Sequence, residues 1–232
     1  MKTIPCLLSQ AARRSPHRIA VINHDEIISY ARLDALVERA RHTLGGLGVK
    51  KNTRVSILSV NSLPYIVLLL ALWRLKAIAC LLSARLPHAE IIRQLKMINS
   101  EILFASMDGA DRQDIPAVIF NMDVIMTGKR GQLPFRHKRE LTPFSLHQPA
   151  TIIFTSGTTG TPKAVLHSIG NHLYSAKGSN DNIPVEPGDR WLLSLPLYHV
   201  GGLSILFRIL LGRGTLVIVP STRDVARPLD QY

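Results

Sequence analysis

The sequence predicts an α/β fold in which layered, mostly parallel sheets are flanked by helices. The first observation behind this prediction is alternation, because segments with helical apolar spacing are followed by short apolar runs of strand length. The second is size, since 232 residues with 46% hydrophobic composition can bury a core of that kind.

The first half of the chain supplies most of this alternation. A helix is expected after Ser29, because Leu, Val and Ala recur with helical period until a group of glycines ends the pattern. Residues 62–74 predict a second, buried helix, and Pro87 stands at the expected first turn of a third. The predicted strands are residues 54–60 and 78–82, and residues 101–105 and 117–120 are further short apolar runs.

The second half continues the pattern with predicted strands and helices in turn. The strands are residues 151–154, 191–195 and 215–219, and the helices are centred on residues 170–178 and 202–211. Between the halves lies a basic segment with few aliphatic residues. We therefore expect a first α/β subdomain over residues 1–126, a basic connecting loop over 127–149 and a second, incomplete α/β subdomain over 150–232.

The charge balance favours anionic partners. The formal net charge is +12, which suits nucleic acid, phosphate-bearing small molecules or acidic membranes without choosing among them. The basic connecting loop lacks the helix or aromatic platform that nucleic-acid contacts use, so we favour a solvated loop and expect no nucleic-acid partner. Binding to duplex with a steep salt dependence would support the alternative of a nucleic-acid-binding protein.

The cysteines and the apolar stretches bear on location. Cys6 and Cys80 form no CxxC pair and have no metal-ligand spacing, which favours a reducing, cytoplasmic compartment. No signal peptide is visible, and the most apolar stretch, residues 63–84, is interrupted by Arg74 and Lys76. A membrane span is therefore not expected.

The chemistry concentrates in a loop that directly follows the predicted strand 151–154. Glycines allow a close backbone approach to a ligand, backbone N–H groups can form an anion-binding concavity, and hydroxyls and a lysine add further contacts. The loop is not a Walker A motif, because Pro162 precedes its lysine. An ordinary Gly/Thr-rich turn is the bland alternative. The parts needed to hold a polyphosphate are all present, namely Gly157 and Gly160, the hydroxyl residues Thr155, Ser156, Thr158, Thr159 and Thr161, and Lys163.

This loop resembles the signature loop of the adenylate-forming superfamily, which includes acyl-CoA synthetases, non-ribosomal adenylation domains and luciferases. Further landmarks of that family follow the same order in this chain. They are residues 28–33, Asn61 with Ser62, residues 73–87 and residues 195–203. The chain departs from the family pattern at Lys76, Leu81, Ala84 and Ala164.

The resemblance implies roles for individual residues. The loop would clamp the β- and γ-phosphates of ATP, with Lys163 and His199 as the catalytic residues and His199 beside the acyl carboxylate. From the residues alone, we expect His199 to end a strand and to face two loop glycines, and a lone histidine there is more often structural. Arg208 is either a surface charge or a partner for a second substrate carboxylate. The implied substrate-binding residues are His199, Gly201, Gly202 and Arg208.

Residues 167–176, 188–196 and 201–208 resemble one branch of the family, the 2-succinylbenzoate–CoA ligases of menaquinone synthesis. The implied substrates and cofactors are a small carboxylic acid, ATP with Mg²⁺, and CoA, in an AMP-forming ligase reaction. Alternatives are a fatty or aromatic acid–CoA ligase of the same superfamily, or a non-catalytic ATP-binding remnant.

Relatives carry a magnesium-binding glutamate, a ribose-binding aspartate and a small C-terminal domain beyond the position of Tyr232. The chain is therefore expected to be a truncated, N-terminal fragment without the C-terminal domain, and no residue in it is expected to ligate a metal.

Overall fold

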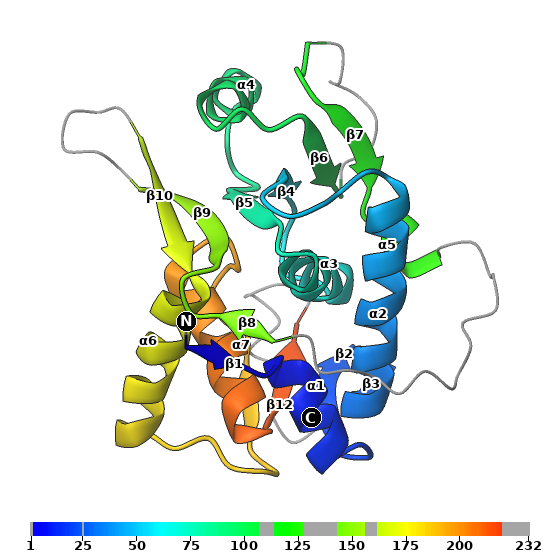
Figure 1. Ribbon diagram of the computed structural model, residues 1–232, viewed down its shortest axis with the longest axis vertical. Helices are drawn as coiled ribbons and strands as arrows, with labels where there is room; N and C mark the ends of the chain where they lie inside the picture. The colour runs from blue at the N-terminus through cyan, green and yellow to red at the C-terminus, as the bar shows by residue number, and fades with distance from the viewer. Residues whose placement is uncertain (1, 25, 107–113, 128–142, 156–161, 220–232) are drawn as a thin grey trace.

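The computed structural model describes residues 2–24, 26–106, 114–127, 143–155 and 162–219, which form an α/β fold with mostly parallel sheets between helices, as predicted (Figure 1). The strands are β1 (Thr3–Ile4), β2 (Ile19–Asn23), β3 (Glu26–Ser29), β4 (Arg54–Leu58), β5 (Ile78–Leu82), β6 (Ile102–Ala105), β7 (Val118–Asn121), β8 (Phe144–Ser145), β9 (Pro149–Thr155), β10 (Lys163–Ser168), β11 (Arg190–Leu192) and β12 (Thr215–Ile218). The helices are α1 (Leu7–Arg14), α2 (Tyr30–Gly46), α3 (Leu63–Arg74), α4 (His88–Met97), α5 (Val124–Thr127), α6 (Ile169–Asn182) and α7 (Val200–Gly212).

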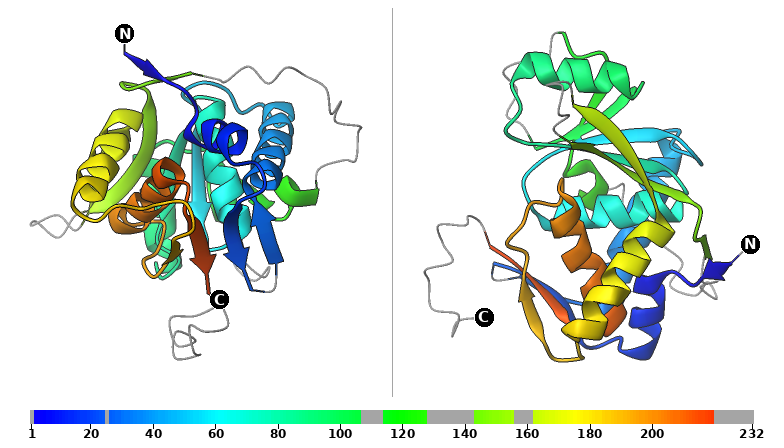
Figure 2. Two further views of the ribbon diagram at one scale, coloured as in Figure 1. Left: turned by 90° about the horizontal axis from the view of Figure 1, so that it is seen from below. Right: turned by 90° about the vertical axis from the view of Figure 1, so that its left-hand side faces the viewer.

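The larger sheet has the strand order β10-β9-β5-β4-β6-β7, and all its strand pairs are parallel except β10 with β9. Alternate side chains of β5 point to opposite faces of this sheet. Cys80 packs with Ile98 after α4, whereas Leu81 belongs to the core shared with α3. The right-hand view of Figure 2 shows α4 on one side of the sheet and α3 on the other.

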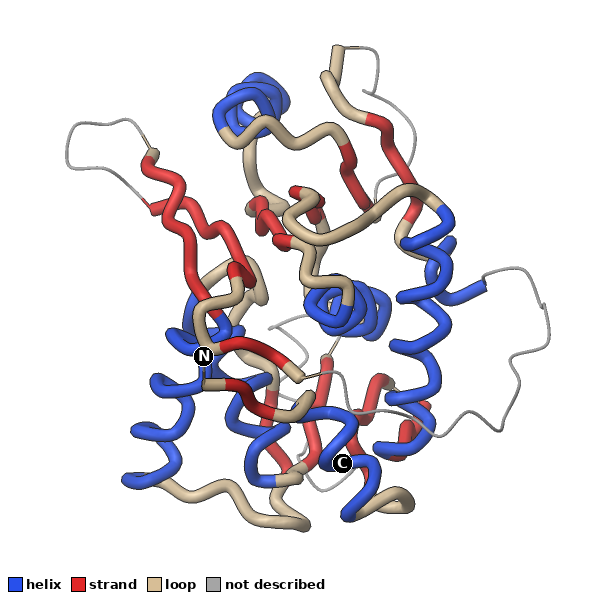
Figure 3. The backbone as a smooth tube through the Cα atoms, viewed as in Figure 1, coloured by secondary structure: helices blue, strands red, loops and turns tan. Residues whose placement is uncertain are grey.

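Helix α3 forms the centre of the molecule. It lies between the six-stranded sheet and the four-stranded sheet β11-β12-β2-β3, as the two groups of strands above and below it in Figure 3 show. Its side chains from Tyr65 to Arg74 are all buried, and Trp73 donates its indole N–H to the carbonyl of Ala150 at 3.1 Å. A helix that is apolar on all sides is stable when protein covers every face, which agrees with the predicted buried helix.

One buried ion pair connects the central helix to its neighbours. Arg74 on α3 pairs with Asp34 on α2, and both side chains are at most 5% exposed. The same guanidinium donates to Glu38 on α2 at 3.2 Å and to Ser9 on α1 at 2.9 Å. A buried charge needs such partners, so these contacts fix how α1, α2 and α3 pack.

Both large sheets take strands from either side of the predicted connecting loop. Strands β9 and β10 extend the sheet of β4–β7, while β11 and β12 pair with the sheet of β2 and β3. The segments 1–126 and 150–232 therefore share both sheets. Their division into two subdomains stays a prediction. Residues 128–142 of the basic connecting loop lie outside the described residues.

Several predicted elements are confirmed. Helix α2 begins after Ser29, whose side-chain oxygen accepts a hydrogen bond from the N–H of Arg32 at 3.2 Å, and Ser62 caps α3 in the same way. Strand β5 has the predicted bounds. Pro87, however, is the N-cap residue of α4 rather than part of its first turn. Strands β1–β3, β8 and β10 and helices α1 and α5 were not predicted.

Strand β10 was missed for a physical reason. It is an edge strand, and its side chains show no clear alternation between buried and exposed positions. It forms because it pairs with β9 over its full length, which a pattern within the strand itself does not reveal. In the part of the chain that the structure describes, no helix is both long and apolar enough to cross a membrane.

Candidate functional site

A cleft of about 220 Å³ opens at the carboxyl ends of β5 and β9. Ligands of open α/β sheets bind at this edge, because the strands end there and the loops that follow them converge. The cleft is walled by residues from β5, α4, β9 and the segment before α7. They are Leu81, Ser83, Leu86, Gln94, Phe154, Thr155, Pro162, Tyr198 and His199.

Two ends of the predicted phosphate loop meet at this cleft. Thr155 ends β9, Lys163 begins β10, and the two residues are opposite each other in the antiparallel pairing. Both side chains are exposed, and Thr155 and Pro162 line the cleft. The pairing of β9 with β10 therefore holds the loop's two ends together at the cleft. Ser156, Gly157, Thr158, Thr159 and Gly160 lie outside the described residues.

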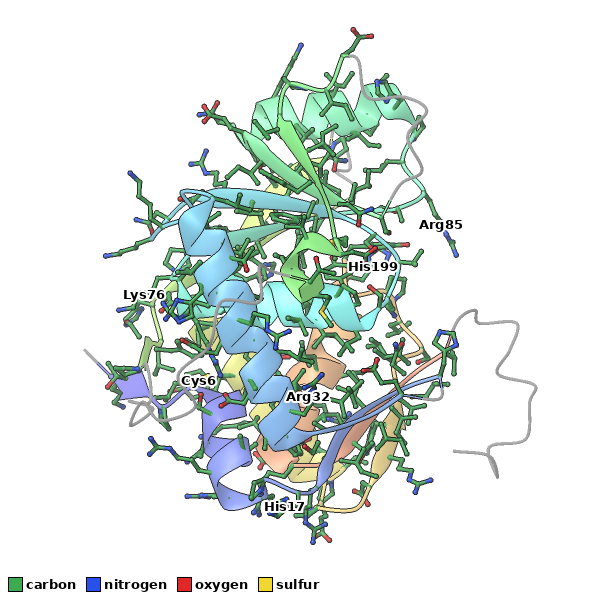
Figure 4. The ribbon with its side chains drawn as sticks, turned by 90° about the vertical axis from the view of Figure 1, so that its right-hand side faces the viewer. Cys6, His17, Arg32, Lys76, Arg85 and His199 are labelled. Carbon is green, nitrogen blue, oxygen red and sulfur yellow. The ribbon has the colours of Figure 1, made fainter. Side chains whose placement is uncertain are left out.

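His199 also lines this cleft, but its local structure differs from the expectation. It does not end a strand, because β11 stops at Leu192. His199 is instead the N-cap residue of α7, with an exposed side chain that makes no capping hydrogen bond. Its ring lies edge-on to the ring of Tyr198, with centroids 4.7 Å apart. Figure 4 shows His199 on the opposite side of the molecule from Lys76.

The two expected loop glycines lie in the first turn of α7, which corrects the prediction. A Cβ atom at position 202 would lie 2.3 Å from the carbonyl oxygen of Pro196, so only glycine fits there. A Cβ atom at Gly201 would meet only the end of the flexible Leu195 side chain, at 2.8 Å. Gly202 thus allows α7 to start directly against the segment that carries His199. Substrate contact by either glycine stays a prediction.

Asn61, which follows β4, fixes that same segment. Its side-chain N–H₂ group donates to the carbonyls of Leu193 and Leu195 at 3.3 and 2.9 Å. Its side-chain oxygen accepts the backbone N–H of Leu197 at 2.8 Å. We did not predict this role, although a polar residue directly after a parallel strand was an available signal. Asn61 holds the chain just before Tyr198 and His199.

Arg208 lies away from the cleft, on the part of α7 that packs against α6. Its guanidinium donates to the side-chain oxygen of Asn180 at 2.8 Å and to the carbonyl of Ile183 at 2.7 Å. It also lies 4.2 Å from the centroid of the Trp191 ring, a cation–π contact. These contacts tie α7 to the end of α6. Binding of a second substrate carboxylate by Arg208 stays a prediction.

The structure adds cleft residues that sequence reasoning missed, chiefly Tyr198 and Gln94. Tyr65 of α3 lies near Tyr198 and is fully buried, and its hydroxyl has no hydrogen-bond partner among the described residues. Burial, with a smaller effect from Tyr198, raises the pKa of Tyr65. Across the described ranges, no three His, Cys, Asp or Glu side chains are grouped to hold a metal ion.

Comparison with known proteins places this arrangement in a family. The model of the family "AMP-binding enzyme" matches residues 8–231. A 2-succinylbenzoate–CoA ligase of Bacillus cereus (strain ATCC 10987 / NRS 248) is 34% identical over 220 residues, which cover 95% of this chain and 44% of the relative. The chain therefore spans less than half the length of this curated relative.

Solved structures agree with this match. The o-succinylbenzoate CoA synthetase of Bacillus subtilis in complex with the acyl-adenylate OSB-AMP superposes with a TM-score of 0.87 at 30% identity, over 99% of this chain and 60% of that one. The same enzyme in complex with ATP and magnesium ion gives 0.86 at 29% identity, over 99% and 62%. Because the family model covers nearly the whole chain, this protein belongs to the AMP-binding enzyme family.

Proposed function

We propose that this chain forms the ATP-phosphate and acid-binding part of an AMP-forming acid–CoA ligase, with 2-succinylbenzoate as the acid. One observation carries the proposal. Thr155 and Pro162, at the two ends of the phosphate loop, line the same cleft as His199, the residue proposed to meet the acid. A phosphate site and a carboxylate site in one cleft are what a reaction between an acid and ATP requires.

The proposed reaction has two steps. A carboxylate oxygen attacks the α-phosphorus of ATP, which forms an acyl-adenylate and releases pyrophosphate. The sulfur of the CoA thiolate then attacks the acyl carbonyl carbon, and the bond from that carbon to the AMP oxygen breaks. ATP is proposed to enter with Mg²⁺. This chain would contribute positioning and charge neutralisation rather than a covalent intermediate.

Named residues can carry these tasks. Lys163, with the hydroxyls of Thr155, Ser156, Thr158 and Thr159, would neutralise and orient the departing pyrophosphate. His199 would orient the attacking carboxylate. The first turn of α7 has backbone N–H groups without helical partners, including those of Gly201 and Gly202, and a helix N-terminus favours an anion. The proposed acid therefore lies at the start of α7.

The choice of acid rests on the relatives, which are named for 2-succinylbenzoate and o-succinylbenzoate. The resemblance of residues 167–176 and 188–196 to that branch supports the same choice. A fatty or aromatic acid is the alternative within the superfamily, because related scaffolds serve many acids. A cytoplasmic location is proposed with this function; Cys6 and Cys80 are both free and buried.

The proposal is tested by ATP–pyrophosphate exchange with the purified chain, supplied with 2-succinylbenzoate, a fatty acid or an aromatic acid. Exchange that depends on 2-succinylbenzoate supports both the proposed reaction and the choice of acid. Exchange that depends on another acid supports the reaction but names that acid as the substrate. Binding of Mg-ATP without exchange would favour the non-catalytic ATP-binding alternative. A folded chain that neither binds Mg-ATP nor catalyses exchange contradicts the proposal.

A further inference from the structure

The cleft contains a polar group that the proposed reaction does not use. Gln94 of α4 lines the cleft together with Thr155 and His199, and only 3% of its surface is exposed. Its side-chain oxygen is buried and has no hydrogen-bond partner among the described residues. Buried polar atoms in native proteins are almost always paired, so an unpaired one in a binding cleft suggests a missing partner.

The neighbours of Gln94 decide which end of its amide is free. The N–H₂ group donates to a carboxylate oxygen of Glu90 at 2.9 Å. Glu90 also accepts two hydrogen bonds from Arg93, at 2.7 and 3.0 Å, and these bonds lower the pKa of Glu90. An ionised carboxylate only accepts hydrogen bonds, so the amide nitrogen must face Glu90. The carbonyl oxygen of Gln94 is therefore the end without a partner.

Among the described residues of the cleft wall, none donates a hydrogen bond to this oxygen, although Ser83, Thr155 and Tyr198 carry hydroxyl groups. Leu81, Leu86 and Phe154 are apolar, and Pro162 has no backbone N–H group. The hydroxyl oxygen of Ser83 accepts the backbone N–H of Arg85 at 3.3 Å, and Arg85 itself is exposed and points away into solvent (Figure 4). The described part of the cleft thus combines apolar side chains with one buried acceptor that has no partner.

We propose that the side-chain oxygen of Gln94 accepts a hydrogen bond from a neutral N–H or O–H group of the bound ligand, and so contributes to ligand specificity in this cleft. An acceptor beside an ionised carboxylate repels phosphates and carboxylates, whereas it favours an amide, amino or hydroxyl donor. The anionic groups are proposed to contact Thr155, Lys163 and His199 instead.

This inference rests on the proposed function, which supplies the candidate ligands. Doubly ionised 2-succinylbenzoate has no N–H or O–H group, so Gln94 should not recognise it. ATP carries an amino group and ribose hydroxyls, and CoA carries amide N–H groups and hydroxyls. The shared chemistry is a neutral donor, and separate binding measurements distinguish the two sources.

The chain offers a matched control in Gln148. It is also buried, at 7% exposure, its N–H₂ group donates to the carbonyl of Trp73 at 3.0 Å, and its oxygen also lacks a partner among the described residues. It does not line the cleft. Replacing either glutamine with methionine removes a buried amide of similar size, but only Gln94→Met changes the cleft wall.

The test is calorimetric titration of the wild-type chain, Gln94→Met and Gln148→Met with Mg-ATP, CoA and 2-succinylbenzoate separately. We expect Gln94→Met to weaken binding of ATP or CoA by about 3- to 10-fold, the loss of one neutral hydrogen bond, with 2-succinylbenzoate unchanged. Gln148→Met should leave all affinities unchanged. It should lower the unfolding temperature about as much as Gln94→Met does.

Unchanged affinities in Gln94→Met, or an equal loss for all three ligands, would overturn the role of Gln94 while leaving the proposed function in place. A wild-type chain that binds only the donor-free acid would overturn it as well. A folded wild-type chain that binds none of the three ligands would instead contradict the proposed function, and the inference would fail with it.

Discussion

Asn61 and Leu197 are 136 positions apart in the sequence, yet the side-chain oxygen of Asn61 accepts the backbone N–H of Leu197 at 2.8 Å. With its bonds to the carbonyls of Leu193 and Leu195, Asn61 satisfies three backbone groups of the segment before His199. The position of the candidate site therefore depends on a residue outside the phosphate loop.

Replacing Asn61 with alanine should lower the free energy of unfolding by about 2–3 kcal/mol, because it leaves partly buried backbone groups without partners. Urea denaturation measures the change. Asn182→Ala is the control, since the exposed Asn182 side chain donates to the carbonyl of Gly178 one turn earlier in α6 and has no other hydrogen bond among the described residues. A loss no larger than that of the control would contradict the role given to Asn61.

The two glycines at the start of α7 should respond differently to the same change. Gly202→Ala places a Cβ atom against the rigid carbonyl of Pro196, so we expect a loss of about 2 kcal/mol or more and a displaced His199. Gly201→Ala meets only a flexible leucine end, so its cost should be smaller. Thermal unfolding of both variants checks this order, and a larger cost at Gly201 would refute it.

The buried pair of Arg74 and Asp34 predicts strong coupling. Arg74→Met should destabilise the chain by about 3–5 kcal/mol, because the Asp34 carboxylate remains buried without its counter-charge. The double variant Arg74→Met/Asp34→Leu should cost less than the sum of the two single changes. A double-mutant cycle measured by urea denaturation tests this, and additive losses would argue against the pair as the packing determinant of α2 and α3.

The buried His172 should make the folded chain less stable at acidic pH. Its imidazole is buried beside Thr151, with the Thr151 hydroxyl oxygen 2.8 Å from the ring nitrogen Nε2. Burial, helped by nearby His167, lowers the pKa of His172 to about 4. The unfolded chain, with an ordinary histidine pKa, therefore takes up the proton first as the pH falls. The contribution of neutral His172 to the free energy of unfolding is fully present above pH ~6.5 and is lost as the pH falls towards 4.

Between pH 7.5 and 5 this one group should remove about 2 kcal/mol from the free energy of unfolding. Urea denaturation across that range measures the slope, and His172→Gln should show a shallower dependence than the wild type. Equal slopes in the two proteins would show that His172 does not titrate as described.

Sequence reasoning worked where the signal is local. The periodic apolar residues and the Ser29 cap placed α2, and the continuous apolar stretch placed α3, because a helix satisfies its own backbone within one segment. The glycine-rich loop was singled out by residue type and His199 by the resemblance to the family, and the structure brings Thr155 and His199 to one cleft. Their chemical roles stay predictions.

Contacts between distant segments were not predictable in the same way. Strand β10 exists through its pairing with β9, and the helical position of Gly202 follows from its packing on Pro196. Glu90 orients the Gln94 amide from within α4, but the place of Gln94 in the cleft depends on β5, β9 and the segment before α7. Each depends on tertiary neighbours that no pattern within one segment encodes.

The central claim is that the loop at Thr155 and Lys163 holds the phosphates of ATP. Calorimetric titration of the chain with Mg-ATP, compared with Lys163→Ala and with Lys177→Ala as a control at an exposed position of α6, tests it most directly. We predict saturable binding by the wild type, a loss of about tenfold or more in Lys163→Ala, and little change in Lys177→Ala. Equal affinities in all three proteins, or no binding by a folded wild-type chain, would contradict the claim.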